Sequence, residues 1–328
     1  MFFGKVNGRF YRNGGNVLNQ NEMIYNRGRT DLALEVREKF EQDNVEVEGV
    51  ILKETYHKNK EIKVTTVTIE NEHGAKVMGK PIGTYITIEA PKLSEEDESY
   101  HKPLSKEVAR YLKKLMGEKK EEHVLIVGLG NRDITPDALG PQVVDNLFVT
   151  RHLIKEYGQE FKEDNKMEIM SAIAPGVMGQ TGMEVSEILK GIIHETHPKL
   201  AIVIDALAAR STERLNTTIQ LTDTGISPGS GVGNNRKALN EEGLGIQTIA
   251  IGVPTVVDAV TIVSDAMENF MADKGFSEDE VNEFIREVGD ATIQNMFVTP
   301  NNIDESIKKI SYTISEALNS CFCESLTE

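Results

Sequence analysis

Two aspartates stand where a carboxylate could act on a bound molecule. Asp137 follows a buried-looking apolar run, Val124–Val127, and Asp205 closes a second run, "LAIVID". Ligands bind outside the carboxyl ends of parallel strands, so the two side chains are expected to converge over one edge of a sheet. Each aspartate alone could instead cap the helix that follows it. Both together, each beside a turn of small residues, favour a shared site.

Paired carboxylates have a specific chemistry. Two that lie close together cannot both ionise easily, so one keeps its proton near neutral pH. The ionised partner can take a proton from a water molecule, and the protonated one can protonate a leaving group. Such a pair supports hydrolysis with neither a metal ion nor a covalent intermediate. A third aspartate, Asp258 in "PTVVDAV", is predicted to lie in the first turn of a helix.

A glycine-rich turn, "GLGN", precedes the first aspartate and raises the question of a phosphate site. It lacks the third glycine of a dinucleotide-binding loop, and no P-loop motif occurs in the chain. A second glycine-rich stretch, residues 225–236, is predicted to form a loop that lines a cleft. Backbone N–H groups in these turns could bind a substrate or a developing oxyanion. The candidates are Gly128, Gly130, Asn131 and Gly231.

Other catalytic and metal sites have less support. No G-x-S-x-G motif occurs, and Ser211 and Ser230 have no evident histidine partner. No histidine follows His197, so a zinc site made of the two aspartates and a downstream histidine is excluded. Cys321 and Cys323 are interpreted as incidental, in a reducing cytoplasmic compartment. No metal or other cofactor is expected.

The elements that position the aspartates alternate along the chain. From residue 123 onward, short apolar strands alternate with amphipathic helices, which indicates an α/β fold with a mainly parallel sheet flanked by helices. Two β-branched runs and the stretch "GTYITIEAP" predict a small N-terminal antiparallel region within residues 32–100. The predicted strands of the α/β part are 123–128, 167–173, 199–204, 217–222 and 247–252. The predicted helices are 104–117, 141–157, 182–196, 255–274 and 302–320.

Charge separates the N-terminal end from the rest of the chain. Residues 1–29 carry five Lys and Arg against one Glu, whereas the whole chain of 328 residues has a net charge of −16. The segment is therefore predicted to be a loosely ordered basic arm. The acidic total argues against binding to nucleic-acid phosphates, and no apolar run is long enough to cross a membrane.

Four stretches of the sequence resemble the germination protease family of spore-forming bacteria. They are "GLGNRDITPDALGPQVVDNLFVTRHL", "IAPGVMGQTGMEVSEI", "IDALAARSTERLNTTIQLTDTGISPGSGVGNNR" and "IAIGVPTVVDAVTI". The resemblance runs from Arg29 to the last helix. It implies an endopeptidase of the forespore and spore-core cytoplasm that begins the degradation of small acid-soluble, DNA-binding spore proteins during germination. It also implies a homotetrameric zymogen that processes itself.

The resemblance assigns roles to particular residues. The family's catalytic aspartate pair corresponds to Asp137 and Asp205, the two residues that the strand ends already indicate. Self-cleavage corresponds to the bond Asp31–Leu32. Residues 1–31 would then be a basic prosegment, and residues 32–328 a single α/β catalytic domain.

The cleavage segment itself permits two further expectations. A joint between a loose arm and an ordered body is expected to be exposed, where proteolysis concentrates. Glu35 resembles the glutamates of the family's substrates, so the segment is expected to occupy the same cleft. A positive specificity pocket should receive such a side chain. The candidate cations are Arg151, Arg210 and Arg214.

A more distant likeness is to the hydrogenase maturation peptidases, which resemble this chain in a G-x-G-N turn and a later aspartate. This likeness implies the same fold, and it offers a metal-dependent maturation peptidase as the alternative function. Those enzymes use a histidine as a third metal ligand. The missing downstream histidine counts against that role here.

Overall fold

The computed structural model describes residues 4–6, 9–11, 30–42, 47–57, 61–95, 98–117, 123–229, 236–263, 266, 270 and 296–323. The chain divides into two compact units. The larger unit comprises Thr30–Val257 and Phe297–Glu328, and the smaller comprises Met1–Arg29 and Asp258–Met296. The candidate site described below lies within the larger unit.

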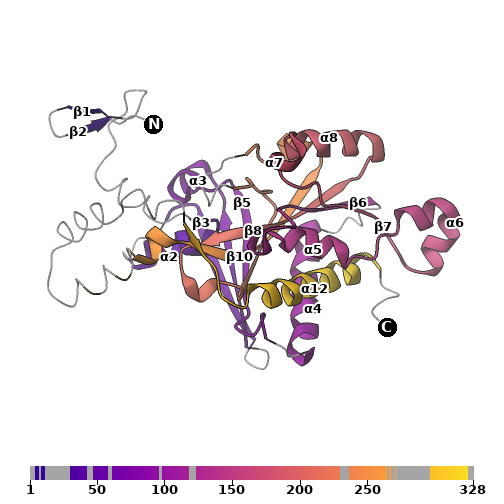
Figure 1. Ribbon diagram of the computed structural model, residues 1–328, viewed down its shortest axis with the longest axis horizontal. Coiled ribbons are helices and arrows are strands. Elements are labelled where there is room, and N and C mark those ends of the chain that lie inside the picture. Colours follow the sequence, from indigo (N-terminus) through magenta and orange to yellow (C-terminus); the bar gives the residue numbers. More distant parts are fainter. Residues whose placement is uncertain are drawn as a thin grey trace. The chain divides into compact units, whose positions relative to one another are not determined.

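A mixed sheet of nine strands forms the centre of the larger unit (Figure 1). Its order is β3-β4-β5-β9-β10-β8-β6-β7, and β11 pairs with β10. Strands β10, β8, β6 and β7 run parallel, whereas β3, β4, β5 and β9 pair antiparallel. The bounds are β3 Val50–His57, β4 Ile62–Ile69, β5 Gly83–Glu89, β6 His123–Gly128, β7 Ile169–Ile173, β8 Leu200–Ala209, β9 Thr218–Thr222, β10 Gln247–Asp258 and β11 Phe297–Val298. The predicted α/β class is confirmed, and the N-terminal antiparallel strands extend the same sheet.

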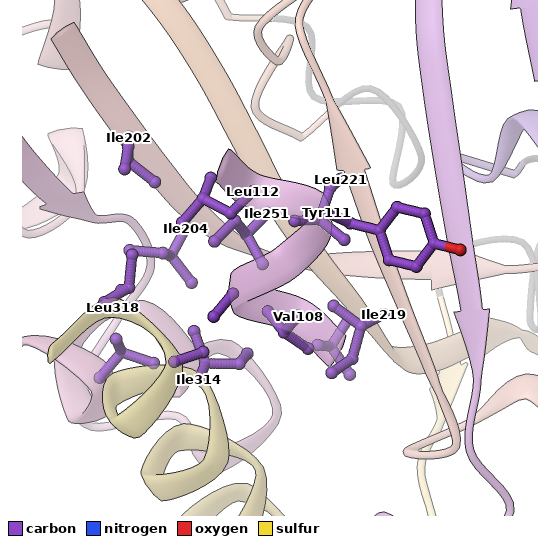
Figure 2. Packing of buried hydrophobic residues seen from close by; sticks show 14 of the residues in the cluster. Val108, Tyr111, Leu112, Ile202, Ile204, Ile219, Leu221, Ile251, Ile314 and Leu318 are labelled. Carbon is purple, nitrogen blue, oxygen red and sulfur yellow. The ribbon is translucent and has the colours of Figure 1, made fainter. Parts of the chain in front are cut away.

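Helices on both faces explain why the central strands are apolar throughout. One face is covered by α4 (Glu98–Met116), α5 (Leu139–Asp145) and α12 (Ile303–Phe322). Figure 2 shows side chains of two of these helices packed against the strands. The helices contribute Val108, Tyr111, Leu112, Ile314 and Leu318, and strands β8, β9 and β10 contribute Ile202, Ile204, Ile219, Leu221 and Ile251.

The opposite face carries two smaller clusters. Helices α8 (Val185–Thr196) and α9 (Glu241–Leu244) pack on the alternate residues of β6 and β8. Helices α2 (Ala33–Gln42) and α3 (Glu72–Met78) pack on β4 and β5. The strand alternation places Asp205 on this second face, because its neighbour Ile204 belongs to the first.

Two of the predicted helices are wrong in extent. The helix predicted at 141–157 is two helices, α5 and α6 (Arg151–Asp164). The chain leaves the helix between them because Thr150 bonds to β7: its hydroxyl accepts the N–H of Met170 at 2.8 Å, and its own N–H donates to the Met170 carbonyl at 3.0 Å. The helix predicted to begin at 255 begins later, since β10 continues to Asp258 beside β8.

The remaining predicted helices of the α/β part are confirmed as α4, α8 and α12. Three short elements join the larger ones at the ends of the strands. They are the 3₁₀ turns η2 (Thr135–Asp137) and η3 (Thr212–Arg214), and the single-turn helix α7 (Met178–Thr181). Within the described residues, no helix is long and apolar enough to cross a membrane.

In the smaller unit, β1 (Gly4–Val6) and β2 (Arg9–Tyr11) pair antiparallel within the predicted arm, whose other residues lie outside the described ranges. Asp258 is the last residue of β10 rather than part of a helix's first turn. Its carboxylate accepts the N–H of Val260 at 2.9 Å, so it caps the helical residues 259–263.

Candidate active site

Asp205 is a buried carboxyl group within an apolar strand. It lies in β8, "LAIVIDALAA", and only 7% of the residue is exposed. Its Oδ1 accepts the N–H of Ala206 at 2.9 Å. Burial raises the pKa of Asp205 well above its ordinary value, and the charges of Asp137 and Asp31 raise it further. Both effects favour the neutral acid more than in an exposed aspartate.

Asp137 ends the short turn η2 and is held from two sides. Its Oδ2 accepts the N–H of Asn131 at 2.8 Å. The turn itself is tied to β10, because the Thr255 hydroxyl donates to the Pro136 carbonyl at 2.7 Å. Burial raises the pKa of Asp137, and the hydrogen bond from Asn131 opposes the rise. Asp137 is thus the member of the pair better suited to carry the negative charge.

The glycine-rich turn before Asp137 allows the backbone to approach closely. Gly130 has φ +113°, and a Cβ on it would collide with the Asp137 carbonyl oxygen. A Cβ on Gly128 would likewise collide with the carbonyl of Gly140, at the start of α5. The N–H of Leu129 is already used, since it donates to the Ile204 carbonyl at 2.8 Å. These glycines therefore let the chain after β6 pack closely on η2 and α5. Strand β8 continues to Ala209 rather than ending at 204 as predicted, so Asp205 lies within the strand and not at its end.

The segment that follows the N-terminal arm lies beside the two aspartates. The Asp31 N–H donates to the Ala208 carbonyl at 3.0 Å, and the Ala208 N–H donates to Asp31 Oδ2 at 3.0 Å. The small residues after Asp205 leave room for this approach. Leu32 is 0% exposed, so the expectation of an exposed joint is wrong. The joint is buried because its backbone and side chains bind the sheet.

The carbonyl of Asp31 has two side-chain donors. Lys80 Nζ lies 2.9 Å from this oxygen, and Gln220 Nε2 lies 3.3 Å from it. The Gln220 amide also accepts the N–H of Ala33 at 2.8 Å through its Oε1. The sequence reasoning missed both residues. The signal for Gln220 was a lone amide within the apolar strand β9, "TIQLT", where a buried polar side chain requires a partner.

Glu35 occupies a pocket lined by hydrogen-bond donors. The residue is 5% exposed, and its carboxylate accepts the N–H groups of Arg210 at 2.8 Å and Ser211 at 3.0 Å. Its Oε2 is also the partner of the Thr30 hydroxyl. Arg214 Nε lies 3.5 Å from Glu35 Oε1. A carboxylate four residues after Asp31 is thus bound by two amides and a guanidinium.

The three predicted cations differ in their positions. Arg214, whose side chain is 11% exposed, also pairs with Glu38 at 2.6 Å and Glu89 at 3.0 Å. Arg210 contributes its backbone N–H to the pocket. Arg151 lies elsewhere, at the start of α6, where its charge lowers the pKa of His123 in addition to the larger effect of burial. His123 begins β6, at the amino ends of the parallel strands.

Two of the other residues predicted to contact a substrate or an oxyanion are Asn131 and Gly231. The Asn131 N–H binds Asp137, and the Asn131 side chain accepts from Gln180 Nε2 at 3.1 Å. Gly231 lies outside the described residues. Among the residues that the structure describes, no group of three or more His, Cys, Asp and Glu could hold a metal ion.

The cysteines lie away from this site. The thiols of Cys321 and Cys323 are free, and they contact the carbonyl oxygens of Ala109 and Phe148. Burial raises the pKa of Cys321 to about 12 and that of Cys323 to about 11. Neither thiol is poised to act as a nucleophile, because the thiolate is the reactive form.

Fold and site together define an α/β protein with two neighbouring carboxyl groups, one within the central strand β8 and one in the turn η2. A family model described as germination protease matches residues 28–277. The chain belongs to the germination protease family, and it is a peptidase.

Similar proteins cover nearly the whole chain. A germination protease of Caldanaerobacter subterraneus subsp. tengcongensis is 47% identical, over 92% of this chain and 95% of that protein. A germination protease of Clostridium perfringens is 44% identical, over 89% of this chain and 94% of that protein. A germination protease of Bacillus subtilis is 39% identical, over 92% of this chain and 94% of that protein.

Among solved structures, a NiFe hydrogenase maturation protease, HycI, from Thermococcus kodakarensis KOD1 is similar to 64% of this chain. The match spans 99% of that protein, with 16% sequence identity and a TM-score of 0.32.

Proposed function

We propose that this chain is an aspartic-type endopeptidase, made as a self-processing zymogen, that begins the degradation of small acid-soluble spore proteins during germination. The protein acts in the cytoplasm of the forespore and spore core, and it assembles as a homotetramer. Residues 1–31 are the prosegment and residues 32–328 the catalytic domain. Its substrates are proteins, and it binds neither nucleic acid nor membrane.

One observation supports this proposal: Asp31 bonds through its N–H and its carboxylate to Ala208, three residues beyond the buried Asp205 on β8, and the charges of Asp137 and Asp31 both raise the pKa of Asp205. The two carboxyl groups and the residue before the processed bond are therefore close neighbours. In this proposal the bond Asp31–Leu32 takes the position of a substrate's scissile bond, and the segment acts as a substrate of the same chain.

The different surroundings of the two aspartates suggest their roles. Asp205 keeps its proton, and Asp137 is ionised and accepts the Asn131 N–H. Asp137 takes a proton from a water molecule, whose oxygen adds to the Asp31 carbonyl carbon. Asp205 gives its proton to the Leu32 nitrogen as the C–N bond breaks. The products are the Asp31 carboxylic acid and the Leu32 amine.

The pocket around Glu35 supports a preference for acidic substrates. It receives a carboxylate four residues beyond the cleaved bond, with two backbone N–H groups and Arg214 as partners. Such charge-assisted bonds are about twice as strong as neutral ones. Glu35 stays in the chain after cleavage at Asp31–Leu32, so a spore protein with a glutamate at the matching distance would occupy the same pocket only after the segment that begins at Leu32 has left it.

Replacement of each aspartate tests the proposal. Asp137→Asn and Asp205→Asn should each reduce cleavage of a purified small acid-soluble spore protein by several orders of magnitude, because two groups that act as a unit fail together. Cleavage is measured after incubation of the full chain at mildly acidic pH.

Asp164→Asn, at the exposed end of α6, is the matched control and should cleave at the wild-type rate. Circular dichroism should show all three variants folded. Wild-type cleavage by a folded Asp137→Asn or Asp205→Asn chain would reject the aspartate pair.

A further inference from the structure

The bond Asp31–Leu32 is clamped on both sides. Gln220 donates to the Asp31 carbonyl and accepts the Ala33 N–H, so one amide group spans the bond. On the other side of Asp31, the backbone pairs with Ala208. The carbonyl group is consequently fixed in one orientation, with its oxygen directed at Lys80 and Gln220.

Lys80 reaches this oxygen from a rigid support. It follows α3 directly, after Gly79 in the left-handed conformation, and its N–H donates to the Ala75 carbonyl at 3.2 Å. Burial lowers the pKa of Lys80, while the charges of Asp31 and Glu35 oppose that change. A poorly hydrated ammonium interacts with a nearby negative charge far more strongly than one in water.

The sheet places these donors on the same side as the aspartates. Asp205 on β8, Gly252 on β10 and Gln220 on β9 are directly opposite one another in register. Residues opposite one another on neighbouring strands share a face, so the Asp205 and Gln220 side chains stand on one face, two strands apart. The central position is a glycine, and the side chain of Leu207 packs over it.

We propose that Lys80 and Gln220 form the oxyanion-binding site of this peptidase, with Lys80 as its charged donor. The proposal rests on the proposed function, in which the Asp31 carbonyl carbon is attacked. When water adds to that carbon, the carbonyl electron pair moves onto the oxygen, and the ammonium stabilises the new charge. When the C–N bond breaks, the pair returns to re-form the carbonyl. A protein substrate would place its own carbonyl oxygen in the same position.

A merely structural role for Lys80 must be separated from this one. As an anchor, Lys80 would hold the segment in place, and its loss would release residues 31–36 from the sheet. As an oxyanion donor, it would affect the rate of cleavage while the segment stays bound. Hydrogen exchange of residues 31–36 measures the first effect, and mass spectrometry of the Leu32 product measures the second.

The test uses the full chain with Lys80→Met. We expect self-cleavage to slow by about 10²–10³-fold, the usual effect of losing one oxyanion donor, with hydrogen exchange of residues 31–36 unchanged. Lys76→Met, one turn earlier on the exposed side of α3, is the matched control and should cleave at the wild-type rate. If the Lys80→Met chain does not fold, Lys80→Gln replaces it, and this neutral donor should still slow cleavage at least about tenfold.

Three results would overturn the assignment. One is a wild-type rate in the folded Lys80→Met or Lys80→Gln chain. Another is a rate that falls only together with loss of hydrogen-exchange protection, since that shows an anchor. The third is failure of the wild-type chain itself to cleave at Asp31–Leu32, which rejects the proposed function as well. Only the first two reject the Lys80 assignment while the proposed function stands.

Discussion

At the scale of single residues, Asp205 should make the protein less stable as the pH rises. In the unfolded chain it ionises near its ordinary pKa of 3.8, whereas burial and the charges of Asp137 and Asp31 keep it protonated to higher pH in the folded chain. The folded state then binds more protons than the unfolded state, so stability falls above about pH 4. Each unit of pKa difference contributes about 1.4 kcal/mol.

The prediction is that Asp205→Asn stabilises the chain in a pH-dependent way. Asparagine cannot ionise, so the variant should melt several degrees above wild type at pH 7 and together with it near pH 3. The melting temperature by differential scanning calorimetry at both pH values measures this. Equal melting temperatures at pH 7 would show that Asp205 carries no penalty of ionisation.

Glu35 provides a second prediction at this scale. Glu35→Gln removes a charge that two N–H groups and Arg214 bind, and charge-assisted bonds contribute about 1.5–3 kcal/mol each. Self-cleavage at Asp31–Leu32 should therefore slow by at least about tenfold. The rate is followed by mass spectrometry.

Glu213→Gln, an exposed neighbour of the same pocket, is the matched control and should leave the rate unchanged. A wild-type rate of self-cleavage in Glu35→Gln would mean that the pocket does not require a negatively charged side chain.

At the scale of elements, the turn before Asp137 should be intolerant of a side chain. Gly130→Ala places a Cβ against the Asp137 carbonyl at φ +113°. The turn must shift, and displacement of a catalytic group by about 1 Å can lower activity about 100-fold. The loss in stability should stay at about 1–3 kcal/mol, because the strain is local. Cleavage rate and urea unfolding measure the two effects.

Gly191→Ala is the corresponding control in α8, where a Cβ meets open space. It should keep full activity and stabilise the chain by about 0.5–1 kcal/mol. Full activity in Gly130→Ala would show that the turn does not position Asp137.

The same scale shows what the sequence could and could not predict. Continuous apolar runs predicted where the parallel strands lie, because helices cover both faces of these strands. The end of β10 was missed because Pro254 resembles a helix start. The strand in fact continues beside β8 through a register shift between Pro254 and Val256. A proline is tolerated at such an irregularity, but the partner strand that requires it is remote in sequence.

The sequence indicated some residues of the candidate site and not others. Asp137 and Asp205 could be found because each follows or ends an apolar run. Lys80 and Gln220 could not, since their partner is a backbone carbonyl and no side-chain pattern marks it. The burial of Leu32 was missed because the local composition around residue 30 predicts a loosely ordered arm and does not indicate the sheet to which the segment binds.

At the scale of the whole molecule, the net charge fits the proposed action on DNA-bound proteins. The chain carries −16, and loss of residues 1–31, with five Lys and Arg and two acids, leaves −19. An acidic protein is repelled by DNA phosphates, so activation would not lead it to bind the nucleic acid itself.

The most direct test of the account is to follow the intact mass of the full-length chain after a change from neutral to mildly acidic pH. We predict a slow reaction at neutral pH and, on acidification, a product whose new N-terminus is Leu32. The full-length Asp205→Asn chain should keep its mass under the same conditions. Cleavage at Leu32 in the Asp205→Asn chain, or a wild-type chain that stays intact at every pH, would contradict the claim that this pair of aspartates cuts the segment bound beside it.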